Sequence, residues 1–235
     1  MGRLRFIAAA AISIASAIVE LLLIWLDRKR GRVFHAIARW WARTVLRVCG
    51  VRVSVRGLEE VDFSRNYVYV SNHASMFDIP VIVSGVPDQI RIIYKKELHL
   101  IPFFGWGLRF GSYIGIDRGR GTKALRSLEE ATEKIRRGAS VLMYAEGTRT
   151  LDGKLQQFKR GAFNLAVKAR TPVVPLIVNG SYSILPKHSI NVRPGRVELV
   201  LAPPVPVPPG EGKEAEMQLM QEVHAAIARH YIEQG

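Results

Sequence analysis

The chain has 235 residues, a formal net charge of +14 and a single cysteine, Cys49. The length fits one good-sized α/β domain with appendages, and one cysteine excludes an internal disulfide bond and a metal site built from several cysteines. The positive charge is uneven, because residues 1–56 carry 11 Lys/Arg against 2 Asp/Glu, whereas residues 57–235 carry 23 against 18. Since the basic N-terminal region is also the most apolar one, the composition favours an anionic membrane surface over nucleic acid as a partner.

The N-terminal apolar run from Phe6 to Leu26 is 21 residues long and is interrupted only by two serines and one glutamate. This length is sufficient to cross a bilayer, but the alanine-rich first half is weakly hydrophobic, so both spanning and entry into one leaflet stay open. A cleaved signal peptide is the alternative, although the run continues nine residues past the cleavage-like Ala15-Ser16-Ala17. The basic residues at 28–32 outnumber those before the run, which places the following domain in the cytoplasm.

Residues 33–49 form a second helix candidate with a basic side and an apolar side. The basic stripe comprises His35, Arg39, Arg43 and Arg47, and largely opposite lie Phe34, Ile37, Trp41, Val45 and Val48. Such a helix either lies at the membrane interface with its tryptophans at headgroup level, or packs its apolar side on its own domain. Beside a long apolar run the membrane is the preferred interpretation. Residues 1–50 are therefore predicted to be a membrane-associating helical arm.

Strands and helices alternate through residues 51–202. The expected strands are 51–55, 67–70, 90–94, 113–116, 141–144, 173–178 and 197–201, and the clearest helices are 122–137 and 159–169. This alternation predicts an α/β domain with a central mixed β-sheet flanked by helices, in which functional sites collect at the carboxyl ends of the strands. Residues 203–235 are expected to be a Pro-rich connector followed by an amphipathic helix, 213–231, packed on the domain.

The segment that follows the second strand carries His73 and, five residues later, Asp78. A carboxylate can fix the imidazole tautomer, so that the other ring nitrogen accepts a proton from a hydroxyl group. In one continuous helix the two side chains would point apart, so this pair requires a turn, which Ser75 can supply. The alternative is structural, because Ser75-x-x-Asp78 also fits a helix capping box. On these residues alone, capping is the preferred interpretation.

Three other strand exits carry cationic side chains. They hold Lys95 and Lys96, Arg118, and the run Glu146-Gly147-Thr148-Arg149. Arginine can make paired hydrogen bonds to a phosphate, and a glycine lets backbone N–H groups approach it closely. Taken singly, these residues fit solvated loop charges, a Glu146–Arg149 ion pair, or a hairpin turn at Asp152-Gly153. Taken together, and beside His73, they are the components of a phosphate pocket around a base.

Four segments in this order resemble the motifs of the glycerolipid acyltransferases, most closely the 1-acyl-sn-glycerol-3-phosphate (lysophosphatidic acid) acyltransferases. The segments are Asn72-His73-x-x-x-x-Asp78, Gly115-Ile116-Asp117-Arg118, Glu146-Gly147-Thr148-Arg149 and Val174-Pro175-Leu176-Ile177-Val178-Asn179-Gly180. The resemblance extends from residue 50 to residue 200. It departs from the family at Tyr144-Ala145, where Phe-Pro is common, and at Gly115, where a bulky residue is usual. These departures concern substrate detail.

The resemblance implies transfer of a fatty acyl group from acyl-CoA or acyl carrier protein to the sn-2 hydroxyl of lysophosphatidic acid, which forms phosphatidic acid in phospholipid biosynthesis. It implies His73 as general base, Asp78 as its partner and Arg149 as a phosphate ligand. Residues implied to assist at the phosphate are Arg118, Lys95 and Lys96, and residues implied to shape the pocket are Asn72, Glu146, Gly147 and Thr148. No metal or organic cofactor is implied, because a thioester is already an activated acyl donor. The implied location is the cytoplasmic face of a membrane, such as a bacterial inner membrane.

Other functions stay open at this level. Within the enzyme class, the acceptor can be another lysophospholipid, glycerol 3-phosphate or a lyso-aminolipid. A non-enzyme alternative is a basic membrane-surface binding protein whose His/Asp pair is only a helix cap. Nucleic acid is not expected as a partner, since no recognised binding fold or aromatic platform accompanies the charge. Because Cys49 lies away from the four segments, direct transfer is expected rather than a cysteine acyl-enzyme.

Overall fold

The computed structural model describes residues 1–23, 31–101, 104–110, 113–117 and 122–233, without the side chains of residues 104, 110 and 123–125. These residues form a seven-stranded mixed sheet in the order β1-β7-β6-β2-β5-β3-β4. The strands are β1 (Val51–Arg56), β2 (Val68–Ser71), β3 (Ile90–Lys95), β4 (Ile114–Ile116), β5 (Ser140–Tyr144), β6 (Val173–Asn179) and β7 (Gly195–Leu201). Every strand expected from the sequence is present with ends shifted by two residues or fewer, and the α/β class is confirmed.

The strand directions bring the chemically rich segments to one edge of the sheet. Strand β2 is central and pairs in parallel with β5 on one side and with β6 on the other, so that Val68 lies opposite both Val141 and Val173. Strand β3 is parallel to β5 and β4 is parallel to β3, whereas β7 runs antiparallel to β6. Consequently β2, β3, β4, β5 and β6 all end at the same edge, where ligands bind in open α/β sheets.

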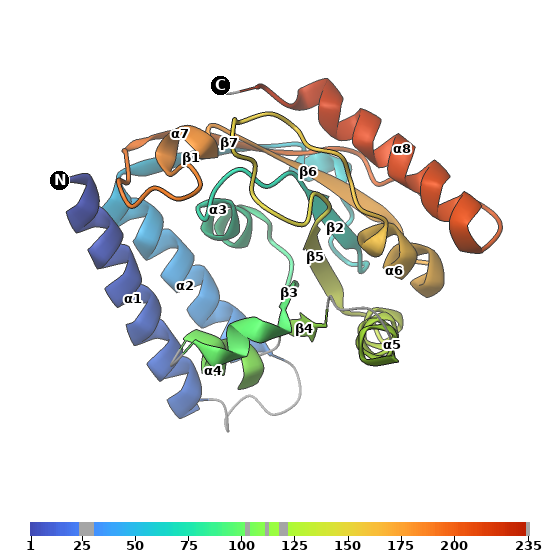
Figure 1. Ribbon diagram of the computed structural model, residues 1–235, viewed down its shortest axis with the longest axis horizontal. Coiled ribbons are helices and arrows are strands. Elements are labelled where there is room, and N and C mark those ends of the chain that lie inside the picture. Colours follow the sequence, from blue (N-terminus) through green and yellow to red (C-terminus); the bar gives the residue numbers. More distant parts are fainter. Residues whose placement is uncertain (24–30, 102–103, 111–112, 118–121, 234–235) are drawn as a thin grey trace.

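Helices cover both faces of the sheet (Figure 1). They are α1 (Gly2–Leu23), α2 (Arg32–Cys49), α3 (Asp78–Gly85), α4 (Phe104–Phe110), α5 (Thr122–Arg136), α6 (Gly161–Ala169), α7 (Ser181–Ile184) and α8 (Gly212–His230), with short 3₁₀ helices η2 (Leu58–Glu60) and η3 (Lys96–Leu100). Helices α2 and α3 pack on one face, and α5, α6 and α8 pack on the other. Because side chains alternate along a strand, Tyr67 and Tyr69 enter the first core and Val68 and Val70 the second.

The apolar side of α2 is buried in its own domain. Its buried residues are Phe34, Ala38, Ala42, Val45, Leu46 and Cys49, and all but Phe34 join the core shared with β1, β6 and β7. Trp41 packs towards α1 and donates its indole N–H to Ser13 Oγ at 2.9 Å. The interpretation of this face as a membrane surface is therefore wrong, since the same side chains close a core. The exposed residues of α2 are Arg32, Ala36, Trp40, Arg43, Arg47 and Val48, so Val48 is the one member of the predicted apolar side that is exposed.

Helix α1 presents its apolar outer side to the surroundings. It is 22 residues long and, by length and composition, is able to cross a membrane; among the described helices no other meets this test. One side packs against α2 and α4, and the exposed side chains include Leu4, Ile7, Ile14, Ile18, Val19 and Leu22. The helix begins four residues earlier than the apolar run predicted, and positions 24–26 of that run lie outside the described residues.

Candidate active site

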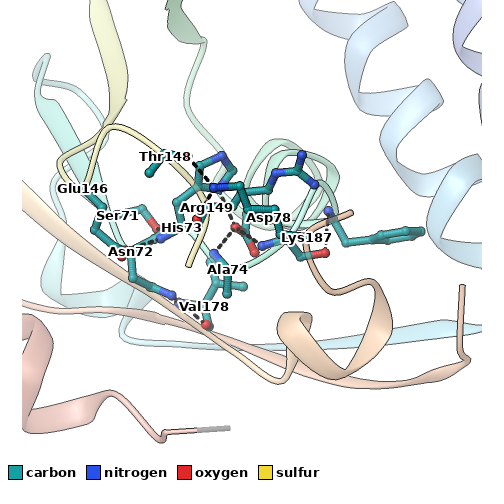
Figure 2. A network of polar contacts seen from close by, with 12 residues as sticks. Ser71, Asn72, His73, Ala74, Asp78, Glu146, Thr148, Arg149, Val178 and Lys187 are labelled. Carbon is teal, nitrogen blue, oxygen red and sulfur yellow. Dashed lines mark hydrogen bonds and ion pairs between the residues drawn. The ribbon is translucent and has the colours of Figure 1, made fainter. Parts of the chain in front are cut away.

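His73 and Asp78 are in direct contact at the carboxyl end of β2 (Figure 2). A turn separates them, and Asp78 is the first residue of α3. Asp78 Oδ2 lies 2.7 Å from His73 Nδ1; the aspartate is fully buried and the histidine side chain is 17% exposed. A carboxylate at this distance selects the tautomer in which Nδ1 carries the proton. The lone pair of Nε2 is then available to accept a proton from a bound hydroxyl group.

The same carboxylate oxygen also shapes the turn. Asp78 Oδ2 accepts hydrogen bonds from the backbone N–H groups of Ala74 and Ser75, both at 2.9 Å. These bonds close the turn before α3, whose N-cap is Phe77 and has no side-chain cap. One oxygen of Asp78 therefore both closes this turn and contacts the imidazole, and the predicted helix cap at Ser75 is not formed.

The main chain of His73 is held by the segment that follows β5. Glu146 Oε1 accepts the N–H of His73 at 2.6 Å, and the His73 carbonyl accepts the N–H of Thr150 at 2.9 Å. The second oxygen of Glu146 accepts the N–H of Gln156 at 3.2 Å, and the side chain is buried. Glu146 is therefore not an ion-pair partner of Arg149. It is a buried hydrogen-bond acceptor that links the backbone of His73 to the loop after β5.

Asn72 fixes the other side of the base. Its side-chain N–H group donates to the carbonyl of Val178 at 3.0 Å, and its Oδ1 accepts the N–H of Val178 at 2.8 Å. The side-chain amide of Asn72 thus makes the two hydrogen bonds to β6 that a neighbouring strand would make, directly after the paired residues of β2 end. Because Asn72 is buried, this pair of bonds keeps the chain close to β6 as it turns towards His73.

Tyr144 lies face to face with the imidazole ring. The ring centroids of His73 and Tyr144 are 3.8 Å apart and the planes differ by 15°. The Tyr144 hydroxyl is buried and has no hydrogen-bond partner among the described residues. Burial, reinforced by the charge of Asp78, raises the pKa of Tyr144 well above its usual value, so the hydroxyl stays protonated. Stacking on this ring restricts the orientation of the imidazole beyond what Asp78 does alone.

The loop after β5 also carries the cation expected to bind a phosphate. Gly147 has a φ of +74°, which a residue with a side chain rarely adopts, and a Cβ there would lie 2.9 Å from Lys159 Nζ. The next residues, Thr148 and Arg149, extend past His73 (Figure 2). Within the described parts of the chain, the Arg149 guanidinium makes no hydrogen bond or ion pair. Its five donors are thus available to an anion.

The remaining predicted cations lie further from His73 along the sheet order. Lys95 ends β3 and pairs with Glu97 at 3.4 Å, and Lys96 begins η3 with an exposed side chain. Neither contacts the His73–Arg149 group, and Arg118 lies outside the described residues. Gly115 is explained by its neighbours, since a Cβ there would lie 3.2 Å from the ring of Tyr94 and 3.3 Å from His99. Two rings occupy the space that a bulky side chain would need.

Comparisons with known proteins agree with this geometry. The family model described as Acyltransferase matches residues 52–179. A 1-acyl-sn-glycerol-3-phosphate acyltransferase of Pseudomonas aeruginosa is 35% identical over 211 residues, which are 87% of this chain and 79% of that protein. The chain belongs to the acyltransferase family. The family match contains His73, Asp78 and Arg149 within one continuous range.

Two further comparisons show how far the likeness extends. A chloroplastic 1-acyl-sn-glycerol-3-phosphate acyltransferase of Brassica napus is 32% identical over 214 residues; this chain spans 62% of its length. The crystal structure of the 1-acyl-sn-glycerophosphate acyltransferase PlsC from Thermotoga maritima superposes with a TM-score of 0.80 at 29% identity, covering 97% of this chain and 93% of that one. The acyltransferase fold therefore includes α1 and α8, which lie outside the family-model match.

One side chain at this acyltransferase site was missed by the sequence analysis. Lys187, after α7, donates hydrogen bonds to Thr148 Oγ1 at 3.0 Å and to the Arg149 carbonyl at 3.1 Å. Nothing in the sequence marks it, because it follows a proline in a segment with no periodic pattern. Among the described residues there is no group of three or more His, Cys, Asp or Glu side chains with the arrangement of a metal site. That the reaction needs no cofactor stays a prediction.

The buried carboxyl of Glu146 predicts a pH effect on stability. Burial raises the pKa of Glu146 from 4.5 to about 7, although two backbone N–H groups oppose the shift. Between these pH values the folded chain keeps a proton that the unfolded chain has lost, so the free energy of unfolding falls as the pH rises. Glu146→Gln is expected to make this pH dependence shallower between pH 4.5 and about 7, as measured by urea unfolding. The exposed Glu129→Gln serves as the control, and equal slopes in wild type and Glu146→Gln would contradict the assignment.

Proposed function

We propose that the protein is a 1-acyl-sn-glycerol-3-phosphate acyltransferase. It transfers a fatty acyl group from a thioester of coenzyme A or acyl carrier protein to the sn-2 hydroxyl of lysophosphatidic acid. The observation that carries this proposal is the oriented His73–Asp78 pair with an unpaired arginine, Arg149, on the adjacent loop. A base and a cation in the loops that follow the neighbouring strands β2 and β5 suit an acceptor that holds both a hydroxyl and a phosphate group.

The reaction proceeds by direct transfer. Nε2 of His73 accepts the proton of the acceptor hydroxyl while the oxygen attacks the thioester carbonyl, and Asp78 stabilises the imidazolium that forms. When the tetrahedral intermediate collapses, the C–S bond breaks and the thiolate takes the proton from Nε2. The only cysteine of the sequence, Cys49, is buried with its Sγ 3.7 Å from the Arg5 carbonyl, which does not suit an acyl-enzyme nucleophile. No metal or organic cofactor takes part in the proposal.

The phosphate is bound chiefly by Arg149. Lys95, Lys96 and Arg118 remain candidates for additional contacts with the acceptor headgroup, on the resemblance to the family. Gly147 permits the left-handed turn that precedes Arg149, and Thr148 lies between them. A guanidinium with no partner among the described residues is able to make the paired contact that arginine forms with phosphate oxygens.

Two cavities with mainly apolar linings are candidates to hold the acyl chain of a substrate. A cavity of about 110 Å³ begins beside Met76 and Phe77, in the turn between His73 and Asp78. A second cavity of about 120 Å³ continues towards Tyr94 and Tyr113. Both cavities are lined by Ser13 and Trp41, so the α1–α2 contact lies between them. The outer apolar side of α1 holds the enzyme on the cytoplasmic leaflet, where lysolipids are available.

An acceptor panel tests the proposal. The purified protein is incubated with acyl-CoA or acyl carrier protein and with lysophosphatidic acid, another lysophospholipid, glycerol 3-phosphate or monoacylglycerol, and products are identified by lipid mass spectrometry. Wild type is expected to prefer lysophosphatidic acid strongly over monoacylglycerol. Arg149→Ala should lose most of that preference, by about 10-fold or more, and Arg149→Lys should restore it only in part, because lysine lacks the paired contact.

The exposed Arg52→Ala on the edge strand β1 is the charge-matched control and should behave as wild type. If the wild-type protein prefers another acceptor, that acceptor replaces lysophosphatidic acid as the assigned substrate. Failure of every acceptor to consume thioester would favour a membrane-surface binding protein instead.

A further inference from the structure

Lys187 is fixed against the loop that carries Arg149. Its ammonium donates to Thr148 Oγ1 at 3.0 Å and to the carbonyl oxygen of Arg149 at 3.1 Å (Figure 2). It lies beyond residue 179, where the match to the family model ends. Its chain segment comes from β6, which pairs with the opposite side of β2 from the strand that leads to Arg149. Lys187 therefore approaches Arg149 from the opposite side of β2.

The segment around Lys187 is fastened to both loops of the site. Ser75, in the turn after His73, donates its hydroxyl to the carbonyl of Leu185 at 2.9 Å. Tyr182 donates its hydroxyl to the carbonyl of Leu151, in the loop after Arg149, at 2.8 Å. These two bonds set the position of Lys187 relative to the base and to the phosphate ligand.

The charge of Lys187 is not neutralised by the residues that hold it. An ammonium has three donors, and two of them are directed at uncharged oxygens of Thr148 and Arg149. No carboxylate in the described parts of the chain pairs with Lys187, and the Arg149 guanidinium is unpaired as well. Two uncompensated cations that meet at one site from different loops are unfavourable unless an anion joins them. A phosphate monoester carries about −1.5 to −2 charges at neutral pH, which matches two cations.

We propose that Lys187 is a second ligand of the acceptor's phosphate monoester and determines, together with Arg149, the preference for a phosphorylated acceptor. This inference rests on the proposed function. The phosphates of coenzyme A have the same chemistry, so the experiment must separate an acceptor role from a donor role. A purely structural role, in which Lys187 only braces Thr148 and Arg149, makes different predictions.

The experiment compares Lys187→Met, Lys187→Gln and Lys187→Arg in the full chain. KM and kcat are measured for lysophosphatidic acid and for monoacylglycerol, with acyl-CoA and with an acyl-N-acetylcysteamine thioester that has no phosphate. Lys187→Met and Lys187→Gln are expected to raise KM for lysophosphatidic acid by about 10-fold or more, because each removes a charged contact to the phosphate. KM for monoacylglycerol should hardly change with either donor, and Lys187→Arg should restore most of the affinity for lysophosphatidic acid.

Lys168→Met on α6 removes an exposed lysine of equal charge and should leave both KM values unchanged. If Lys187 only holds the loop in place, Lys187→Met lowers kcat equally for both acceptors. Lys187→Gln, which keeps a hydrogen-bond donor, then has nearly wild-type kcat. That pair of results overturns the inference. The inference is also overturned if the variants raise only the KM for acyl-CoA and leave the KM for the phosphate-free thioester unchanged. Lys187 would then bind a phosphate of the acyl donor. If the wild-type protein has no preference for phosphorylated acceptors, the proposed function fails. If the wild-type protein has this preference and Lys187→Met retains it, only the inference about Lys187 fails.

Discussion

Replacement of His73 by alanine is expected to lower kcat by about 10²–10⁴ while KM for the acceptor stays nearly unchanged. The reason is geometric: Nδ1 is bound to Asp78, so Nε2 is the only ring nitrogen able to take the acceptor proton, and it acts mainly in the transition state. The backbone N–H and carbonyl of position 73 are held by Glu146 and Thr150, so the alanine variant keeps its loop. The measurement is a steady-state assay with lysophosphatidic acid and acyl-CoA.

Two controls sharpen this result. His230→Ala removes an exposed histidine at the end of α8 and should retain wild-type turnover. Free imidazole should recover part of the activity of His73→Ala, because the cavity left by the ring lies over Tyr144 and beside Asp78. Asp78→Asn should act in the same direction as His73→Ala, since a neutral amide does not stabilise the imidazolium as the carboxylate does. Turnover of His73→Ala within a few-fold of wild type would remove the general base from the mechanism.

Charges placed on the outer side of α1 are expected to abolish membrane binding. Ile7, Ile14 and Ile18 are 62%, 44% and 39% exposed and recur on one side of the helix. Moving each isoleucine out of an apolar environment costs about 1.5–3 kcal/mol, and a glutamate adds the cost of burying a charge. The triple variant Ile7→Glu, Ile14→Glu, Ile18→Glu should therefore lower partitioning into vesicles of anionic phospholipid by at least about 10²-fold. Sedimentation with vesicles measures this.

The full chain is retained in this experiment because deletion of residues 1–49 would also remove core side chains of α2, such as Val45 and Leu46. Ile232→Glu, at a 61% exposed position after α8, is the control for an exposed isoleucine outside α1. Activity on acceptor in vesicles should fall with binding, whereas activity on a soluble short-chain acceptor should persist. Complete sedimentation of the triple variant would show that α1 is not the membrane anchor.

The sequence by itself determined the strands, the class of fold and the pairing of His73 with Asp78. The run at 173–178 is apolar throughout and indicates a buried strand without knowledge of its neighbours, and the structure buries every residue of it. The order of four short segments was enough to indicate the family. These features are local, because hydrophobic periodicity and residue type are properties of about 5–20 consecutive residues.

Tertiary structure decided between the alternatives that local patterns left open. The sequence preferred Ser75 and Asp78 as a helix cap, whereas in the fold one oxygen of Asp78 contacts the histidine and two backbone N–H groups of the preceding turn. An amphipathic helix at 33–49 fits a membrane or a core equally well until the strands that it covers are known, and α2 proved to close a core. Glu146 and Arg149 suggested an ion pair, but the adjacency of β2 and β5 gave Glu146 the N–H of His73 instead.

Lys187 is the clearest case of a feature that only the tertiary structure supplies. It is 39 residues from Thr148 in sequence, and a lysine after a proline in an irregular segment has no periodicity to interpret. Its place at the pocket follows from the strand order β6-β2-β5, which brings the chain after β6 and the chain after β5 to the two sides of His73. Strand order depends on how whole faces pack against helices, and no short stretch of sequence contains that information.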